Sequence, residues 1–240
     1  MRDSTIGTAV AFHIARNWHG VYCVPVESAH RPCARAIMRG QVWERDTLRA
    51  LRQRFKGGGI VTAGTYFGDF LPFLCRLAAR HGAQVWAFEP NRVNHGCAMA
   101  TCGLNTLSNC DLHLGGLGAA PGQTTIRTHD GQGRALGGGS RLAAPRNPRN
   151  SAGYATIPIH TIDATVGDAQ VGLIQLDVEG HELDALRGAE ATIARCRPLL
   201  VLESHGATPV TQDAWLRDLL ERHGYRETGQ TDNNTFLTAS

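Results

Sequence analysis

Residues 173–190 read LIQLDVEGHELDALRGAE and are the most informative stretch of this 240-residue chain. The apolar residues at its start predict a buried strand that ends at Asp177, and Glu179, His181 and Glu182 follow within one turn. Three carboxylates and an imidazole in one turn repel one another, cap a helix or bind a ligand, and they rarely gather for packing alone. A structural interpretation stays open for Glu182, because an acid at a helix start interacts favourably with the helix dipole.

Similar apolar runs alternate with helical segments along the rest of the chain. We expect core strands at 60–63, 84–88, 111–114, 171–176 and 198–202, and two short strands near Tyr225 and Phe236. Helices are expected at 44–55, from a capping Asp69 to Arg80, from Asn91 to Cys102, along the face of Leu183, Leu186 and Ile193, and at 215–220. Strands separated by helices pair in parallel through right-handed crossovers. The pattern therefore predicts a doubly wound α/β fold whose ligand site lies at the carboxyl ends of the strands.

The length of the chain and its content of 42% apolar and 19% charged residues suit one large domain. We expect a single domain over 44–240, preceded by an N-terminal extension, 1–43, that packs on it. Within the domain, 115–160 is expected to be an inserted hairpin or loop region. This insertion is either a solvated segment or a lid over the substrate.

Composition argues against several classes of protein. No apolar run approaches the ~20 residues of a membrane helix, and the N-terminus lacks a secretory signal, so we expect a cytoplasmic protein without membrane contact. Seven cysteines without a Cys-x-x-Cys pair favour reduced thiols over disulfides or a zinc ribbon. A net charge of +3 and arginines without interleaved aromatic residues argue against nucleic acid as a partner. A homodimer stays possible.

A glycine-containing turn follows the first core strand. Gly64 and Gly68 in the segment GTYFG allow a ligand to approach the backbone closely, next to the free N–H groups of a helix start. Tyr66 stands where dinucleotide enzymes have a second glycine, which disfavours a pyrophosphate. Glu89 ends the second strand, where an acid can accept hydrogen bonds from the ribose hydroxyls of an adenosine ligand.

Three segments together resemble the FkbM family of S-adenosylmethionine-dependent methyltransferases. They are IVTAGTYFGDFLPFL at 60–74, VWAFEPN at 85–91, and LIQLDVEGHELDALRGAEATI at 173–193 followed by RPLLVLESH at 197–205. The resemblance implies a class I methyltransferase (Rossmann-like) fold, with a mostly parallel seven-stranded sheet whose last strand is antiparallel.

The resemblance also implies S-adenosylmethionine as the cofactor. The expected cofactor-binding residues are Gly64, Thr65, Tyr66, Gly68, Asp69, Glu89, Pro90, Asn91, Gly116, Leu117 and Asp177. Three positions depart from the family pattern. The family usually carries an acid where Thr62 stands, an Ala-Asn pair at Thr65-Tyr66, and often a lysine at Gln175.

The expected reaction is O-methylation of a hydroxyl on a sugar or secondary metabolite, so the expected partner is a small-molecule or glycan acceptor. Asp177 and His181 are the candidates for orienting and deprotonating that hydroxyl, with His205 as a second base. Glu179 and Glu44 are candidate substrate contacts.

Three alternatives stay open. Asp177, Glu203 and His205 could bind Mg²⁺ as in catechol-type O-methyltransferases, although no metal is favoured. A nicotinamide-dependent oxidoreductase is disfavoured by Tyr66 and by the absence of a Tyr-x-x-x-Lys pair. A non-catalytic S-adenosylmethionine-binding module would bind the cofactor without forming a methylated product.

Overall fold

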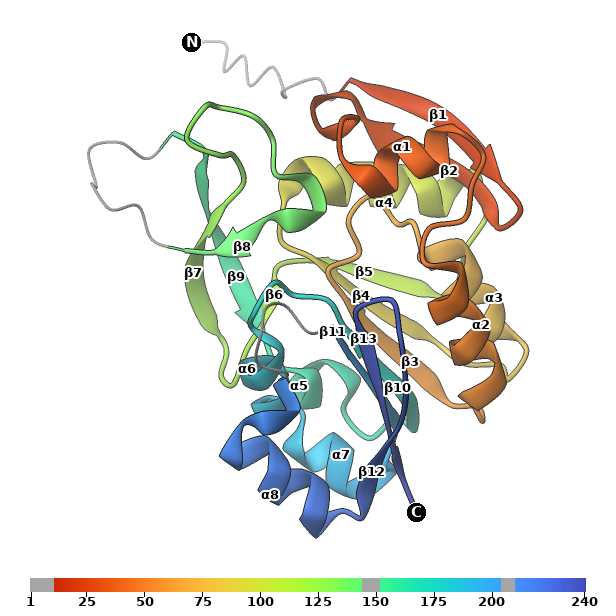
Figure 1. Cartoon of the computed structure of the whole chain (residues 1–240), viewed down its shortest axis with the longest axis vertical. Coiled ribbons are helices and arrows are strands. Elements are labelled where there is room, and N and C mark those ends of the chain that lie inside the picture. Colours follow the sequence, from red (N-terminus) through yellow and green to blue (C-terminus); the bar gives the residue numbers. More distant parts are fainter. Residues whose placement is uncertain (1–10, 144–151, 204–209) are drawn as a thin grey trace, which may run out of the picture.

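A seven-stranded sheet forms the centre of the computed structural model, which describes residues 11–143, 152–203 and 210–240 (Figure 1). Its strands run in the order β12-β13-β11-β10-β3-β4-β5, and β13 is antiparallel to both of its neighbours. The bounds are β3 (Gly59–Ala63), β4 (Val85–Glu89), β5 (Cys110–Leu114), β10 (Val171–Leu176), β11 (Leu199–Glu203), β12 (Tyr225–Thr231) and β13 (Asn234–Ala239). This order and the antiparallel strand confirm the class I methyltransferase topology.

Helices cover both faces of this sheet because adjacent residues of each strand point to opposite sides. Ile60 of β3 packs with α2 (Arg45–Arg54) and α3 (Leu71–Ala79), while its neighbour Val61 packs with the helices of the other face. The remaining helices of the sheet are α4 (Arg92–Leu104), α5 (Ile162–Val166), α6 (Glu182–Arg187), α7 (Glu190–Cys196) and α8 (Ala214–Arg222), with a short 3-10 turn at Val210–Gln212.

Two expected helices differ from the sequence prediction. The helix expected over Leu183–Ile193 is divided into α6 and α7 at Gly188, where a Cβ atom would lie 2.1 Å from the carbonyl oxygen of Gly118. The close approach of that loop displaces the backbone from a continuous helix. Asp69 does not cap α3, because the helix begins at Leu71 with Phe70 as the preceding residue.

The N-terminal part of the chain packs on α4. It forms a hairpin of β1 (Phe12–Asn17) and β2 (Gly20–Pro25), a 3-10 turn (Val26–Ser28) and α1 (Pro32–Met38). The backbone N–H of Cys23 donates to the Thr101 hydroxyl at 3.0 Å, and the N–H of Val21 donates to Asn105 Oδ1 at 3.0 Å. These hydrogen bonds attach the hairpin to the side of α4.

The insertion between β5 and β10 forms a separate four-stranded sheet in the order β6-β9-β7-β8. It contains the predicted hairpin, β7 (Gly122–Arg127) and β9 (Tyr154–His160), together with β6 (Gly116–Leu117), β8 (Arg141–Leu142) and the 3-10 turn η2 (Gly137–Gly139). Figure 1 shows this sheet beside the carboxyl ends of the central strands.

Replacement of Gly64 by alanine tests a close approach between two backbone segments next to the sheet. Gly64 has φ +81°, and a Cβ atom there would lie 1.7 Å from the carbonyl oxygen of Asp177. We expect Gly64→Ala to lower the free energy of unfolding by about 3 kcal/mol or more, measured by urea denaturation. Gly82→Ala is the matched control, because Gly82 also has positive φ but no atom within 4 Å, and it should cost about 1 kcal/mol. Equal decreases in the free energy of unfolding of the two variants would contradict the predicted overlap between a Cβ atom at residue 64 and the carbonyl oxygen of Asp177.

Candidate active site

The turn from Gly64 to Gly68, which follows β3, forms one edge of the site. The N–H groups of Gly64 and Thr65 both donate to the carbonyl of Phe88, at 3.0 and 3.3 Å, and the N–H of Gly68 donates to Thr65 O at 2.7 Å. Tyr66 occupies the left-handed region with φ +50°. The turn is therefore attached to the end of β4, where Glu89 stands.

Glu89 is held by three donors at the end of β4. Its Oε2 accepts from the Tyr66 N–H at 2.8 Å, and its Oε1 accepts from the Asn91 N–H at 2.9 Å and from Asn94 Nδ2 at 3.2 Å. The side chain is 3% exposed, and this burial raises its pKa to about 8. The carboxyl group is thus fixed in orientation and is easily protonated without a ligand.

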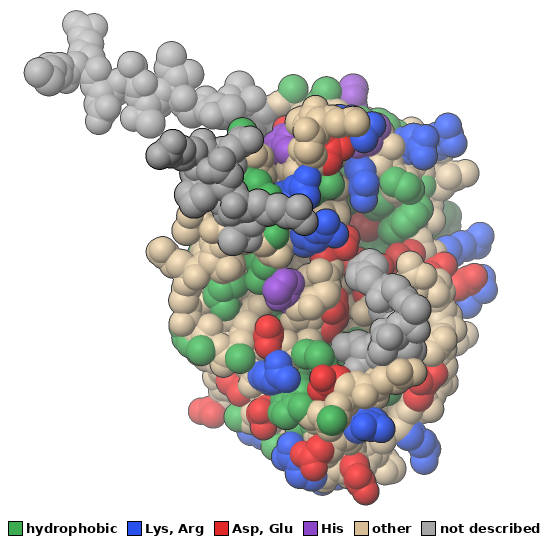
Figure 2. All heavy atoms as spheres, turned by 60° about the vertical axis from the view of Figure 1, so that its left-hand side comes forward, with side chains coloured by type: hydrophobic (Ala, Val, Ile, Leu, Met, Phe, Trp, Pro, Cys, Tyr) green, Lys and Arg blue, Asp and Glu red, His purple; other side chains and the backbone are tan. Residues whose placement is uncertain are grey.

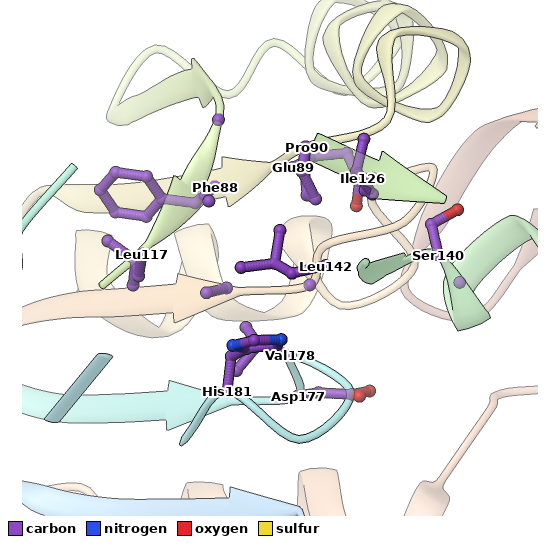
Figure 3. Close-up of a pocket in the computed structure, with 15 residues that line it drawn as sticks. Phe88, Glu89, Pro90, Leu117, Ile126, Ser140, Leu142, Asp177, Val178 and His181 are labelled. Atoms are coloured by element: carbon purple, nitrogen blue, oxygen red, sulfur yellow. The ribbon is translucent and has the colours of Figure 1, made fainter. Parts of the chain in front are cut away.

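A pocket of about 460 Å³ lies between Glu89, the glycine turn and the insertion. Figure 3 shows the apolar side chains of Phe88 and Leu117 at one end, and Ser140 and Asp177 at the other. We call it the nucleoside pocket; its lining is Ala63, Gly64, Phe88, Glu89, Pro90, Gly115, Gly116, Leu117, Ile126, Gly138, Ser140, Leu142, Asp177, Val178 and His181.

The insertion is hydrogen-bonded to the residues around Glu89. Asn91 Nδ2 donates to the Ser140 hydroxyl at 3.1 Å, and Asn94 Nδ2 donates to the carbonyl of Gly137 at 3.1 Å. The Tyr66 hydroxyl donates to Ser28 Oγ at 2.7 Å, which connects the turn with the N-terminal part. The insertion is therefore held at the wall of the nucleoside pocket.

The turn after β10 carries Asp177 and His181. Glu182 is buried, and its Oε1 accepts from the N–H groups of Val178 and Gly180, each at 3.2 Å. Glu182 therefore stabilises the turn by accepting its backbone hydrogen bonds, which supports the structural interpretation of this residue. Burial raises the pKa of Asp177 well above its usual range, and its hydrogen bond with Glu203 acts in the same direction.

A second pocket adjoins the first on the side of Asp177. Five carboxylates line it, and we call it the acidic chamber; they are Glu44, Asp69, Asp177, Glu179 and Glu203. It measures about 730 Å³, and acidic side chains gather near the middle of the face shown in Figure 2. Burial raises the pKa of Glu44 to about 7 and that of Asp69 to about 6.

Strained backbone is concentrated in the acidic chamber. The described part of the chain has six non-glycine residues with positive φ, and three of them line this pocket. They are Glu44 at φ +43°, Tyr66 at +50° and Glu179 at +54°. Such conformations cost of order 1–3 kcal/mol each and cluster at functional sites.

Most of the predicted site residues lie at these two pockets. Gly64 and Asp177 line both, and Thr65 lies with Glu44, Asp69 and Asp177 in a small recess of the chamber. Gly68 and Asn91 lie outside the described linings, where Gly68 closes the turn and Asn91 caps α4. His205 lies outside the described residues.

Several lining residues were missed by sequence reasoning. Arg31 and Trp43 reach the acidic chamber from the N-terminal part, and Ile126, Ser140 and Leu142 reach the nucleoside pocket from the insertion. No local motif marks them, because each arrives through a long-range contact. Two of the departures from the family pattern are adjacent in space, since the Thr62 hydroxyl donates to Gln175 Oε1.

Among residues 11–143, 152–203 and 210–240, no three His, Cys, Asp or Glu side chains are arranged to hold a metal ion. No helix there is both long and apolar enough to cross a membrane.

Comparison with known protein families identifies the group to which the chain is related. A family model described as the methyltransferase FkbM domain matches residues 63–227, which is more than half of the chain. The chain belongs to the FkbM methyltransferase family. The expected resemblance is confirmed, whereas no curated protein sequence matches the chain.

Solved structures of methyltransferases are similar to this FkbM-family chain. The FkbM methyltransferase from Methylobacillus flagellatus KT has a TM-score of 0.53 and 21% identity, over 75% of this chain and 43% of that one. A precorrin-6y C5,15-methyltransferase from Geobacter metallireducens GS-15 has a TM-score of 0.44 and 11% identity, over 80% and 87%. A SAM-dependent methyltransferase from Aquifex aeolicus has a TM-score of 0.41 and 11% identity, over 82% and 88%. The chain spans less than half the length of the M. flagellatus protein, and that similarity establishes the fold alone.

The raised pKa of Glu89 predicts how stability depends on pH. The folded chain holds this proton up to about pH 8, whereas the ordinary value is 4.5. This group therefore favours folding at low pH, and its contribution is lost as the pH rises from about 4.5 to about 8. We expect the Tm of the ligand-free chain to fall over this interval, and Glu89→Gln, which resembles the protonated acid, to reduce the fall. The Glu221→Gln variant, which changes an exposed residue, should show the same fall of Tm with pH as the wild type. An equal fall in Glu89→Gln would contradict the raised pKa of Glu89.

Proposed function

We propose that this FkbM-family chain is an S-adenosylmethionine-dependent O-methyltransferase that methylates a hydroxyl group of a sugar or another small metabolite. The observation that carries the proposal is Glu89, a buried carboxylate at the end of β4, on the wall of a partly apolar pocket beside the glycine turn. An acid in this position suits the two hydroxyls of a ribose.

The residues of the nucleoside pocket suit an adenosine. Glu89 accepts one hydrogen bond at Oε2 and two at Oε1, so one lone pair, at Oε2, remains for a ribose hydroxyl. Phe88 and Leu117 provide apolar contact for the adenine ring. S-Adenosylmethionine supplies an activated methyl group on its sulfonium when it is bound. The residues of this chain bind and orient the reactants and remove a proton.

His181 is the proposed general base. It precedes α6 and lines the nucleoside pocket together with Asp177. An imidazole nitrogen within hydrogen-bond reach of an alcohol is suited to accept its proton as the oxygen is methylated. Asp177, which is hydrogen-bonded to Glu203, orients the acceptor hydroxyl.

Binding of S-adenosylhomocysteine, followed by titration calorimetry, tests the cofactor assignment. We expect Glu89→Gln to weaken the affinity about 10- to 100-fold, because it replaces a carboxylate that accepts ribose hydrogen bonds. Glu221→Gln is again the control, and circular dichroism checks the fold of both variants. Absence of heat with the folded wild-type chain would overturn the proposed function.

Replacement of His181 by alanine separates catalysis from binding. We expect turnover with a methylated acceptor to fall about 10²-fold or more, while the affinity for S-adenosylhomocysteine changes less than about threefold. Full turnover in His181→Ala would remove His181 from the proposed mechanism.

A divalent cation is the second candidate for activating the acceptor, because Asp177 and Glu203 are hydrogen-bonded neighbours at the sheet edge. A metal-dependent enzyme would lose activity on dialysis against a chelator and regain it with Mg²⁺. We expect the rate to be unchanged after dialysis, and a loss that Mg²⁺ restores would favour the metal-dependent reaction.

A further inference from the structure

The described part of the chain exposes its large apolar side chains at one end of the molecule. Seven such residues are between 38% and 92% exposed, and all of them lie in the N-terminal part or on α4, against which that part packs. They are Phe12, Ile14, Trp18, Val26, Met38, Met99 and Leu104. Single exposed apolar residues are common on protein surfaces, whereas a group confined to one end indicates an interaction site.

Trp18 is the most exposed of these side chains. It stands in the turn between β1 and β2, and it is 92% exposed. Phe12 and Ile14 are 51% and 58% exposed, and they share one face of β1 because residues two apart in a strand point the same way. These three side chains contribute little to the core of the chain and are available to another apolar phase.

The same part of the chain carries the net positive charge of the protein. Residues 11–41 contain four arginines and one acid, so their net charge of +3 equals that of the whole chain. Arg16, Arg35 and Arg39 are exposed, as is the acid, Glu27. Figure 2 shows hydrophobic, basic and histidine side chains side by side at the top of the molecule, where Figure 1 places the N-terminal part. The exposed apolar groups are thus accompanied by a local excess of positive charge.

The position of α1 brings its arginines close to the hairpin. One side of the helix is buried against β1 and β2, while Arg35, Met38 and Arg39 are exposed. Asn17 Nδ2 donates to the carbonyl oxygen of Gln41 at 3.0 Å, which attaches the segment after α1 to the end of β1. The arginines of α1 and the apolar residues of the hairpin therefore belong to one end of the molecule.

An anionic lipid surface fits this combination of groups. Tryptophan and phenylalanine are favoured at the boundary between headgroups and acyl chains, and arginine is attracted to anionic headgroups. A second copy of the chain fits less well, because a symmetric contact would bring the arginines of both copies together. A nucleic acid would use the arginines and the aromatic rings, but it offers no apolar phase to Ile14, Met38 or Met99.

We propose that the N-terminal part docks on an anionic lipid bilayer. The exposed apolar residues of the hairpin enter the headgroup region, and the exposed arginines contact lipid phosphates. Binding of this kind needs neither a spanning helix nor a secretory signal, which were the sequence features that argued against membrane contact. It is independent of the proposed function, because none of these exposed residues lines the nucleoside pocket or the acidic chamber.

Co-sedimentation with vesicles tests the proposal on the full chain. One set of vesicles contains phosphatidylcholine alone, and the other contains equal parts of phosphatidylcholine and phosphatidylglycerol. An arginine near an anionic surface strengthens binding about fivefold, so we expect three exposed arginines to favour the anionic vesicles about 100-fold. The association should weaken as the salt concentration is raised, because salt screens the charges.

Surface variants identify the lipid-binding residues. Arg35→Gln combined with Arg39→Gln should weaken association with anionic vesicles about tenfold or more. The matched control, Arg217→Gln combined with Arg226→Gln, makes the same change of net charge on α8 and β12 at the opposite end of the molecule and should leave the association nearly unchanged. Trp18→Ala should weaken it about tenfold, because the variant lacks the most exposed apolar group.

Tryptophan fluorescence reports whether the hairpin enters the lipid. We expect the emission of the wild type to shift to shorter wavelengths with anionic vesicles. Trp18→Phe should bind the vesicles nearly as well but lose the shift. Circular dichroism and the affinity for S-adenosylhomocysteine should be the same in all variants and the wild type, because the replaced side chains are exposed and lie outside both pockets.

The outcomes separate this proposal from the proposed function. Equal association of the two double variants, equal association with the two kinds of vesicle, or no association of the wild type overturns lipid docking. A dimer that Trp18→Ala weakens, found by sedimentation equilibrium without vesicle binding, would assign this end to a second copy, and binding of single-stranded RNA instead of vesicles would assign it to nucleic acid. Absence of S-adenosylhomocysteine binding overturns only the proposed function.

Discussion

The approach of the Gly64 backbone to the carbonyl oxygen of Asp177 sets the geometry on which the candidate site depends. A side chain at Gly64 would overlap that oxygen, so the turn after β3 and the turn after β10 can come together only around a glycine. The same turn is hydrogen-bonded to the end of β4 through Phe88. The carboxyl ends of three neighbouring strands are thereby held at fixed separations, and both pockets are built on them.

Glu89 connects this edge of the sheet with the parts of the chain that cover it. Tyr66 and Asn94 donate to its carboxyl group, and each of them also bonds to another segment: Tyr66 to the N-terminal part and Asn94 to the insertion. One buried acid thus orients the turn, the start of α4 and two covering segments. A ligand that changes the charge state of Glu89 acts on all of them, because the hydrogen bonds to an ionised carboxylate are stronger.

The sequence predicted the central sheet well, because its strands are short apolar runs that end at glycines and acids. The same logic predicted that Gly64, Glu89 and Asp177 meet at one edge, since parallel strands align their carboxyl ends. It could not predict the hairpin of β1 and β2, whose first strand is mostly exposed and shows no periodic apolar pattern. It also missed Trp43 and Leu142, because their positions depend on how whole segments fold back over the sheet.

The left-handed conformations of Glu44, Tyr66 and Glu179 have a consequence for protein engineering. Glycine would adopt these backbone angles without strain, yet the chain retains long side chains at all three positions around the acidic chamber. Thermostability screens would therefore favour glycine at these places while removing the groups that shape the chamber. Resistance to heat and fitness for the chain's biological task are thus expected to be in conflict at these three positions.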